Sequence, residues 1–230
     1  MSWDSDMGID IQNGDLPPIP DRSTVYLDIE TATAPEILFA GLAAANLATA
    51  QEQVAWVLEH AADRALDPFG GRVVCFAICT SNDFEHVHSS IDEFELLKLL
   101  NGYLNAYNPR HIVAHFGHGF DFPFLRARAL ATGLSDLAMQ LWSEKPWDDR
   151  LIDTTHESWW PRPRGAKKEW KSTLSDIAEL LGIVRPPQLG GAETPAAWYQ
   201  GRAEEVEHHC LDDVRVLRQV ARRLAAGRRA

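Results

Sequence analysis

The sequence predicts an α/β domain with a mixed sheet of about five strands flanked by helices. Strand-like segments follow one another near the start of the chain, whereas later ones are separated by helical segments. Strands that meet first as a meander and later through helical crossovers imply a mixed sheet with helices on its faces. The chain has 230 residues, 45% of them hydrophobic, which suits one sizeable core and leaves little room for a second domain.

The N-terminal part combines an irregular stretch with a clear strand. Residues 1–22 are rich in Asp, Gly and Pro and lack periodicity, so we expect a flexible tail followed by a single domain over residues 23–230. The residues after the tail alternate, with one face formed by Val25, Leu27 and Ile29 and the other by Tyr26, Asp28 and Glu30. This pattern predicts a strand that carries two acids on the same face.

Helices and a hairpin are expected next. Residues 35–67 are rich in Ala and Leu with helical spacing, which predicts one or two helices. Residues 72–79 and 84–88 are strand-like and are separated by turn residues, which predicts a β-hairpin.

The remaining segments alternate between helices and strands. Ser90 followed by Glu93 forms a capping-box signature, which predicts a helix to about Tyr107. Thr173 and Gly182 delimit a later helix. Beyond these, we expect strands at 111–115 and 150–153 and helices at 121–133, 173–181 and 203–225.

Composition restricts the possible function. The formal net charge of -11 argues against a protein that holds nucleic acid by a broad basic surface. This argument weakens where clustered carboxylates bind divalent cations, because the ions reverse the local charge. The three cysteines, Cys75, Cys79 and Cys210, lie in apolar segments without paired spacing, which favours buried thiols in a reducing compartment. With no predicted membrane span or secretory signal, we expect a cytoplasmic protein.

Two acidic elements are candidates for metal binding. Asp28 and Glu30 are two residues apart on a strand, so both carboxylates project from one face at a spacing that a hard cation can bridge. Such pairs are also common on surface strands. Asp121 lies among phenylalanines at the expected start of a helix, where burying an acid is unfavourable unless a partner such as a metal ion is present. Asp121 as a simple helix cap is the alternative.

A third element lies in the last helix. His209 and Asp213 are four residues apart and border its apolar stripe, so they stack on the same side. His208 lies five residues before Asp213, roughly 140° away around a regular helix.

Together the three elements resemble the DEDD superfamily of 3′→5′ exonucleases over most of the chain. The first motif of the superfamily, Asp-x-Glu-Thr, matches residues 28–31, and the second, ending in Phe-Asp-x-Pro-Phe-Leu, matches residues 120–125. The third motif of the branch akin to the proofreading domain of family-B DNA polymerases, Tyr-Cys-x-x-Asp-Val, matches residues 209–214 with His in place of Tyr. The ordered agreement of three motifs is more specific than any one of them.

This resemblance implies a ribonuclease H-like fold and a metal-dependent exonuclease domain that removes nucleotides from 3′ ends, which we expect to be single-stranded DNA. It implies two divalent cations, Mg²⁺ or Mn²⁺, held by Asp28, Glu30, Asp121 and Asp213. His209 has the spacing of the polymerase-like branch, whereas His208 has the His-x4-Asp spacing of the other branch. Continuous helix from about Glu204 favours His209 as the general base, and a later helix start favours His208.

Substrate contacts are expected near the acids and in one basic loop. Residues 161–171 concentrate Lys and Arg beside tryptophans, as in proteins that bind single strands by charge and stacking. A solvated loop whose tryptophans pack on the domain is the alternative, as is core packing for the phenylalanines. The expected substrate-binding residues are Thr31, Phe120, Phe122, Lys167, Lys168 and Trp170.

Two other functions remain open at this point. One is a 3′→5′ exoribonuclease, since the carboxylates do not themselves select the sugar. The other is a catalytically idle nucleic-acid-binding module, which is disfavoured because all four acids are present. We expect any proofreading role to require a separate polymerase or repair partner. The sequence leaves the oligomeric state open.

Overall fold

The computed structural model describes residues 24–143, 150–155, 172–186 and 189–227. Five strands form one sheet in the order β3-β2-β1-β4-β5. The strands are β1 (Thr24–Thr33), β2 (Gly71–Thr80), β3 (Glu85–Ser89), β4 (His111–Ala114) and β5 (Leu151–Asp153). The helices are α1 (Pro35–Ala45), α2 (Ala50–His60), α3 (Glu93–Tyr107), α4 (Asp121–Ala131), α5 (Ser135–Gln140), α6 (Leu174–Leu180), α7 (Thr194–Tyr199) and α8 (Ala203–Gly227).

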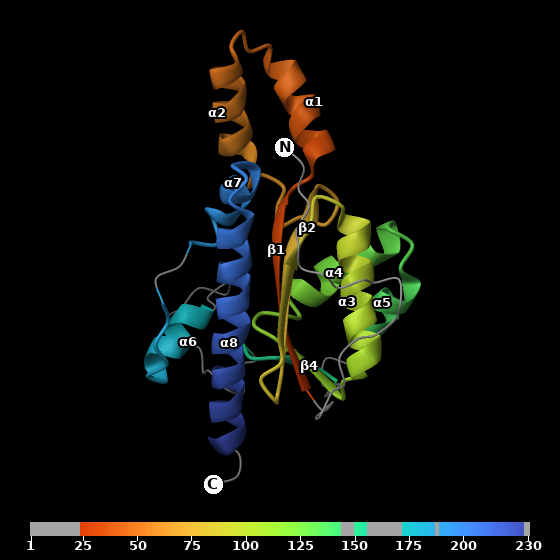
Figure 1. Cartoon of the computed structure of the whole chain (residues 1–230), viewed down its shortest axis with the longest axis vertical. Coiled ribbons are helices and arrows are strands. Elements are labelled where there is room, and N and C mark those ends of the chain that lie inside the picture. Colours follow the sequence, from red (N-terminus) through yellow and green to blue (C-terminus); the bar gives the residue numbers. More distant parts are fainter. Residues whose placement is uncertain (1–23, 144–149, 156–171, 187–188, 228–230) are drawn as a thin grey trace, which may run out of the picture.

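The sheet is mixed, as predicted. Strand β1 pairs antiparallel with β2 and parallel with β4, and β4 pairs parallel with β5. Helices α3, α4 and α5 cover one face, whereas α6, α7 and α8 cover the other (Figure 1). The predicted α/β architecture of about five strands flanked by helices is therefore confirmed.

Strand β1 lies at the centre of the sheet and separates the two layers of the core. Its residues Val25, Leu27 and Ile29 pack toward α3 and α4, while Tyr26 packs toward α8. The alternation of a strand therefore carries Asp28 and Glu30 to the α8 side of the sheet. A shift in the pairing with β2 between Glu30 and Thr31 marks an irregularity just after the two acids.

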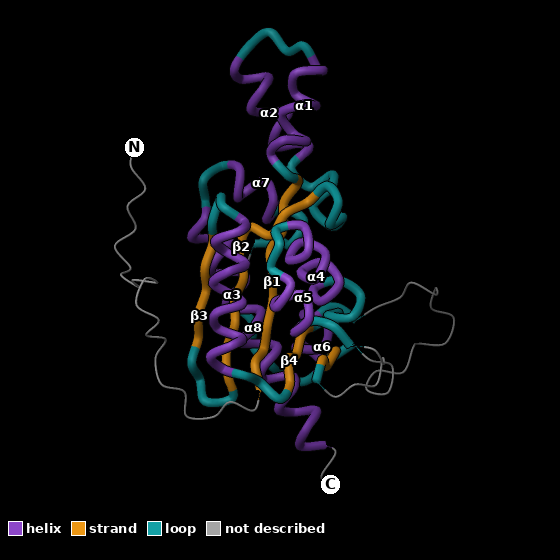
Figure 2. Tube along the Cα trace, turned by 90° about the vertical axis from the view of Figure 1, so that its right-hand side faces the viewer, coloured by secondary structure: helices purple, strands orange, loops and turns teal. Residues whose placement is uncertain are grey.

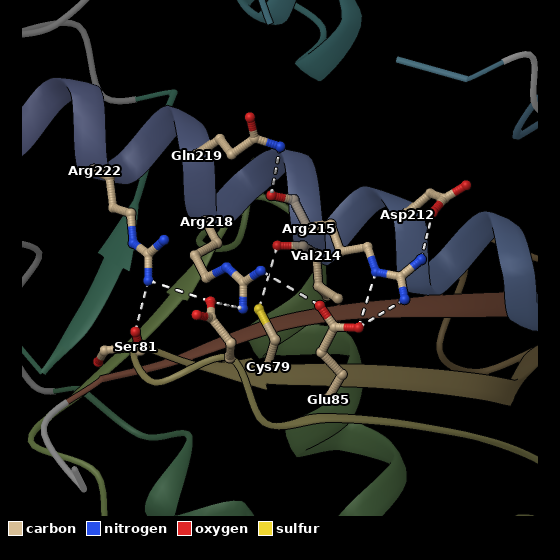
Figure 3. Close-up of polar contacts among 10 residues, drawn as sticks. Cys79, Ser81, Glu85, Asp212, Val214, Arg215, Arg218, Gln219 and Arg222 are labelled. Atoms are coloured by element: carbon tan, nitrogen blue, oxygen red, sulfur yellow. Dashed lines mark hydrogen bonds and ion pairs between the residues drawn. The ribbon is translucent and has the colours of Figure 1, made fainter. Parts of the chain in front are cut away.

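Helix α8 is fixed against the sheet over most of its length. Its buried stripe contains Val206, Cys210, Val214 and Leu217, each no more than 1% exposed. On its polar side, Arg215 donates to Glu85 at 2.7 Å, and Arg218 and Arg222 reach the turn between β2 and β3 (Figure 3). These contacts set the register of α8 against β1, and with it the position of the residues near its N-terminus.

The capping box predicted for α3 is wrong. The helix is capped by Asp92, whose carboxylate accepts a hydrogen bond from the backbone N–H of Glu95. Glu93 instead turns inward, where its carboxylate accepts bonds from Arg128 and from the backbone N–H of Val73. Glu93, which the sequence pattern assigns to capping, thus forms a buried ion pair with Arg128 instead.

Other departures concern short elements. The helix predicted over 121–133 ends at Ala131 and is followed by the separate helix α5. Helix α7 was not predicted, because six residues are too few to show a helical period. The predicted tail and the basic loop lie outside the described residues.

Helices α1 and α2 form a hairpin that projects from one end of the molecule (Figures 1 and 2). Leu38 is the buried residue of α1, and α2 has none, so this hairpin packs only lightly on the rest of the fold. Across the described part of the chain, none of the helices has the length and apolar character needed to cross a membrane.

Candidate metal centre

The first two candidate ligands come from the middle of β1. Glu30 is 9% exposed, and Asp28 is partly buried beneath α8. Both belong to the central strand, where they pair with Ala77 and Cys75 of β2, so the sheet sets the position of their backbone. Thr31 follows them and is 5% exposed, which leaves little of its side chain available to a substrate.

The third acid, Asp121, is the first residue of α4 and is 3% exposed. The N-cap position of this helix is occupied by Phe120, not by Asp121. The loop before it is tightly packed: a Cβ at Gly119 would lie 2.0 Å from the Phe116 ring, and Phe116 itself has φ +59°. Asp153 accepts a bond from the His118 backbone N–H at 3.0 Å, which anchors this loop to β5.

The fourth acid comes from α8. The helix begins at Ala203 and is continuous, so His209 and Asp213 face the same side. The Nε2 atom of His209 lies 3.4 Å from Oε1 of Glu30, and His209 is 8% exposed. His208 is exposed. A helix that is continuous from about Glu204 is the condition under which the sequence favours His209 as the general base, and α8 meets this condition.

The four carboxylates, Asp28, Glu30, Asp121 and Asp213, form what we call the acidic cluster. Burial raises the pKa of Asp28 well above its ordinary value, and the charges of the other three acids raise that pKa further. Burial likewise raises the pKa of Glu30. Burial, aided by the charge of Asp153, raises the pKa of Asp121 to about 7. The carboxylates of Asp28 and Glu30 have oxygen atoms within 4.8 Å of one another.

Arg185 is a site residue that sequence reasoning missed. It contacts Asp213 through one guanidinium nitrogen and the Ser175 hydroxyl through another. Burial raises the pKa of Asp213, and the Arg185 charge opposes that rise. Arg185 follows α6 in a stretch without a recognisable motif, so no spacing in the sequence relates it to Asp213.

A cavity of about 850 Å³ adjoins the acidic cluster. Its lining includes His209 and Asp213 from α8, Arg185, and His115 and Phe116 from the segment after β4. His115 is held by the Thr154 hydroxyl at 2.9 Å and by the Ser172 backbone carbonyl at 3.0 Å. Asp213 of the acidic cluster therefore borders an open space large enough for a nucleotide-sized molecule.

The remaining expected substrate residues have different positions. Phe122 is 1% exposed in the core, so it has no surface to offer a nucleotide, and the expected contact is wrong for this residue. Phe120 is partly buried and its ring lies 5.3 Å from that of Phe124. Lys167, Lys168 and Trp170 lie outside the described residues.

Comparison with known proteins bears on the family and the fold of the chain. A family model described as a predicted 3′-5′ exonuclease related to the exonuclease domain of PolB matches residues 72–217, more than half of the chain. The matched stretch includes Asp121, His209 and Asp213, whereas Asp28 and Glu30 precede it. No curated protein matches the chain.

Among solved structures, the chain is similar to the family B DNA polymerase of the hyperthermophilic archaeon Pyrobaculum calidifontis, with a TM-score of 0.58 and 21% identity. The match covers 92% of this chain and 25% of the polymerase, so the chain spans about a quarter of that protein's length. This likeness confirms the predicted ribonuclease H-like fold. The chain belongs to the family of predicted 3′→5′ exonucleases related to the exonuclease domain of PolB.

Proposed function

We propose that the protein is a metal-dependent 3′→5′ exonuclease that removes nucleotides from the 3′ end of single-stranded DNA. The acidic cluster is the observation that carries this proposal. Four carboxylates share one largely buried site, and within the described residues no Lys or Arg forms an ion pair with Asp28, Glu30 or Asp121. Buried carboxylates that no Lys or Arg neutralises are unfavourable, and divalent cations are the partners that such a site suits.

The donor set fits two Mg²⁺ or Mn²⁺ ions, because carboxylate oxygens are the ligands these hard cations prefer. Asp28, Glu30 and Asp213 would contact the ions directly, and Asp121 would serve the second ion. When bound, such a pair of ions activates a water molecule and stabilises the leaving 3′ oxygen during in-line attack on a phosphodiester.

The proposed general base is His209. Burial lowers the pKa of His209 below its ordinary value, although the charge of Asp213 opposes this effect. The imidazole is therefore neutral at physiological pH and able to accept a proton from the attacking water. Its distance of 3.4 Å from Glu30 places it at the edge of the acidic cluster.

The cavity beside the cluster is the proposed place of the 3′-terminal nucleotide. Arg185 lines this cavity next to Asp213, where its positive charge can face a phosphate of the bound strand. Because the protein as a whole is acidic, this local cation and the bound divalent ions together offset the repulsion of the substrate.

The test uses single-stranded DNA and RNA labelled at either end, incubated with the full chain in Mg²⁺, in Mn²⁺ or in EDTA. Asp28→Ala and Asp213→Ala remove ligands, and Glu59→Gln, an exposed acid on α2, is the control. We expect stepwise shortening from the 3′ end that is lost in EDTA and in both ligand variants but kept in the control. Absence of metal-dependent shortening on all substrates overturns the proposal, and the DNA and RNA arms decide the sugar preference.

A further inference from the structure

Asp213 differs from the other acids of the cluster in having a guanidinium partner. Among the residues that the structure describes, an arginine, Arg185, forms an ion pair with Asp213, and none does so with the other three carboxylates. Both side chains of this pair are largely buried, with 16% of Arg185 and 17% of Asp213 exposed. The protein itself therefore supplies one positive charge to the acidic cluster.

Arg185 contacts both the acidic cluster and the adjoining cavity. One nitrogen of its guanidinium donates to the Asp213 carboxylate, and another donates to the hydroxyl of Ser175 on α6. The same residue lines the cavity of about 850 Å³ beside the cluster. A guanidinium has several N–H donors in a planar fork, so it binds a phosphate with the same geometry as a carboxylate. A phosphate in the cavity can therefore compete with Asp213 for Arg185.

A divalent ion and Arg185 compete for the same carboxylate. Asp213 is one of the proposed ligands of the catalytic ions, and a guanidinium that donates to it repels another cation at that position. This repulsion is weakly screened, because the pair is largely buried. Loss of the Arg185 charge should therefore strengthen the binding of an ion at Asp213. Loss of a residue that merely orients a metal ligand has the opposite effect and weakens metal binding.

We propose that Arg185 is a positioning residue that neutralises Asp213 in the metal-free protein and releases it when a phosphate of the bound strand takes the guanidinium. The ion that needs Asp213 then binds together with the substrate. Coupling between two binding events is reciprocal, so the strand and this ion each strengthen the binding of the other. The competition at Asp213 follows from the ion pair, whereas the transfer of Arg185 to a phosphate rests on the proposed function.

Titration of the metal-free full chain with Mn²⁺ alone, followed by the electron paramagnetic resonance signal of the free ion, tests the competition. Arg185→Gln removes the charge, Arg185→Lys keeps it, and Arg215→Gln is the matched control. Arg215 also forms an ion pair on α8, with Asp212, but it follows Asp213 by two residues and so lies roughly 200° away around the helix. We expect at least about fivefold tighter Mn²⁺ binding in Arg185→Gln, and binding within about twofold of the wild type in Arg185→Lys and in the control.

Thymidine 5′-monophosphate is the probe for the transfer, with its own binding of Mn²⁺ measured without protein and subtracted. It should tighten Mn²⁺ binding more in the wild type than in Arg185→Gln, and equal tightening in both overturns the transfer. Mn²⁺ binding in Arg185→Gln that is equal to or weaker than in the wild type overturns the competition. Circular dichroism checks that each variant is folded, and Arg185→Met replaces Arg185→Gln if the latter is not. The Mn²⁺ titration does not depend on strand cleavage, so its failure and that of the exonuclease assay above are distinguishable.

Discussion

Replacing Asp121 by Asn is expected to stabilise the metal-free protein at neutral and alkaline pH. The Asp121 carboxyl has a pKa raised from 3.8 to about 7, chiefly by burial. Above pH 7 the folded protein must hold this carboxylate charged in a site that disfavours the charge. Asn keeps nearly the same shape and an acceptor oxygen but carries no charge, so the variant avoids the free-energy cost of a buried carboxylate.

The size of the effect follows from the shift in pKa. Between 3.8 and 7 the folded state binds the proton more tightly than the unfolded state, so the free energy of unfolding falls as pH rises through this window. At about 1.4 kcal/mol per unit of pKa, the full cost is roughly 4 kcal/mol. The advantage of Asp121→Asn therefore grows by about 3 kcal/mol between pH 5 and pH 8.

Urea unfolding in EDTA, followed by circular dichroism at several pH values, measures this difference. Glu59→Gln, which neutralises an exposed acid, serves as the control and should show no such trend. Saturating Mg²⁺ should reduce or reverse the advantage, because ions at a hundredfold excess over Kd stabilise the wild type by about 3 kcal/mol. A difference that does not change with pH refutes the reasoning.

Three further predictions concern other residues. Arg128→Met should lower the free energy of unfolding in urea by about 3–5 kcal/mol, because it leaves Glu93, 6% exposed, as an unpaired buried charge. Adding Glu93→Leu should recover most of that loss. A double variant that is no more stable than Arg128→Met contradicts the ion-pair explanation. His209→Ala should lower kcat by at least about a hundredfold, while His208→Ala should not. The activity of the wild type should fall on the acid side below pH 6.5, since burial lowers the pKa of His209 from 6.5. Full activity of the His209→Ala variant excludes His209 as the general base. Glu85→Ala should cost only about 1 kcal/mol in thermal unfolding at low salt and less at high salt, because its Arg215 partner is 42% exposed and its second partner, Arg218, keeps an ion pair with Asp83. A loss independent of salt argues against this ion-pair account.

The sequence predicts best those features that depend on local periodicity. The alternation around Asp28 and Glu30 places both acids on one face of a strand, and β1 has this arrangement. The choice between His208 and His209 depends on where α8 begins, which the sequence leaves open because helix starts are poorly marked. Helix α8 begins at Ala203, and His208 is exposed on it.

Features that depend on contacts between distant segments are not predictable in this way. Arg185 reaches Asp213 across 28 positions of sequence, and Glu93 reaches Arg128 across 35. Neither pair has a spacing that a helix or strand would impose. Phe122, next to the candidate ligand Asp121, could by its residue type either stack on a base or pack in the core, and only its burial in the structure decides for the core.

The polarity and metal dependence of degradation test the central proposal most directly. A single-stranded DNA labelled at its 5′ end, with either a free or a chemically blocked 3′ end, is incubated with the full chain in Mg²⁺. The proposed function predicts a ladder of progressively shorter labelled products from the free end, none from the blocked end and none in EDTA. Immediate release of the labelled nucleotide, internal cuts in the blocked strand, or an intact free strand would contradict it.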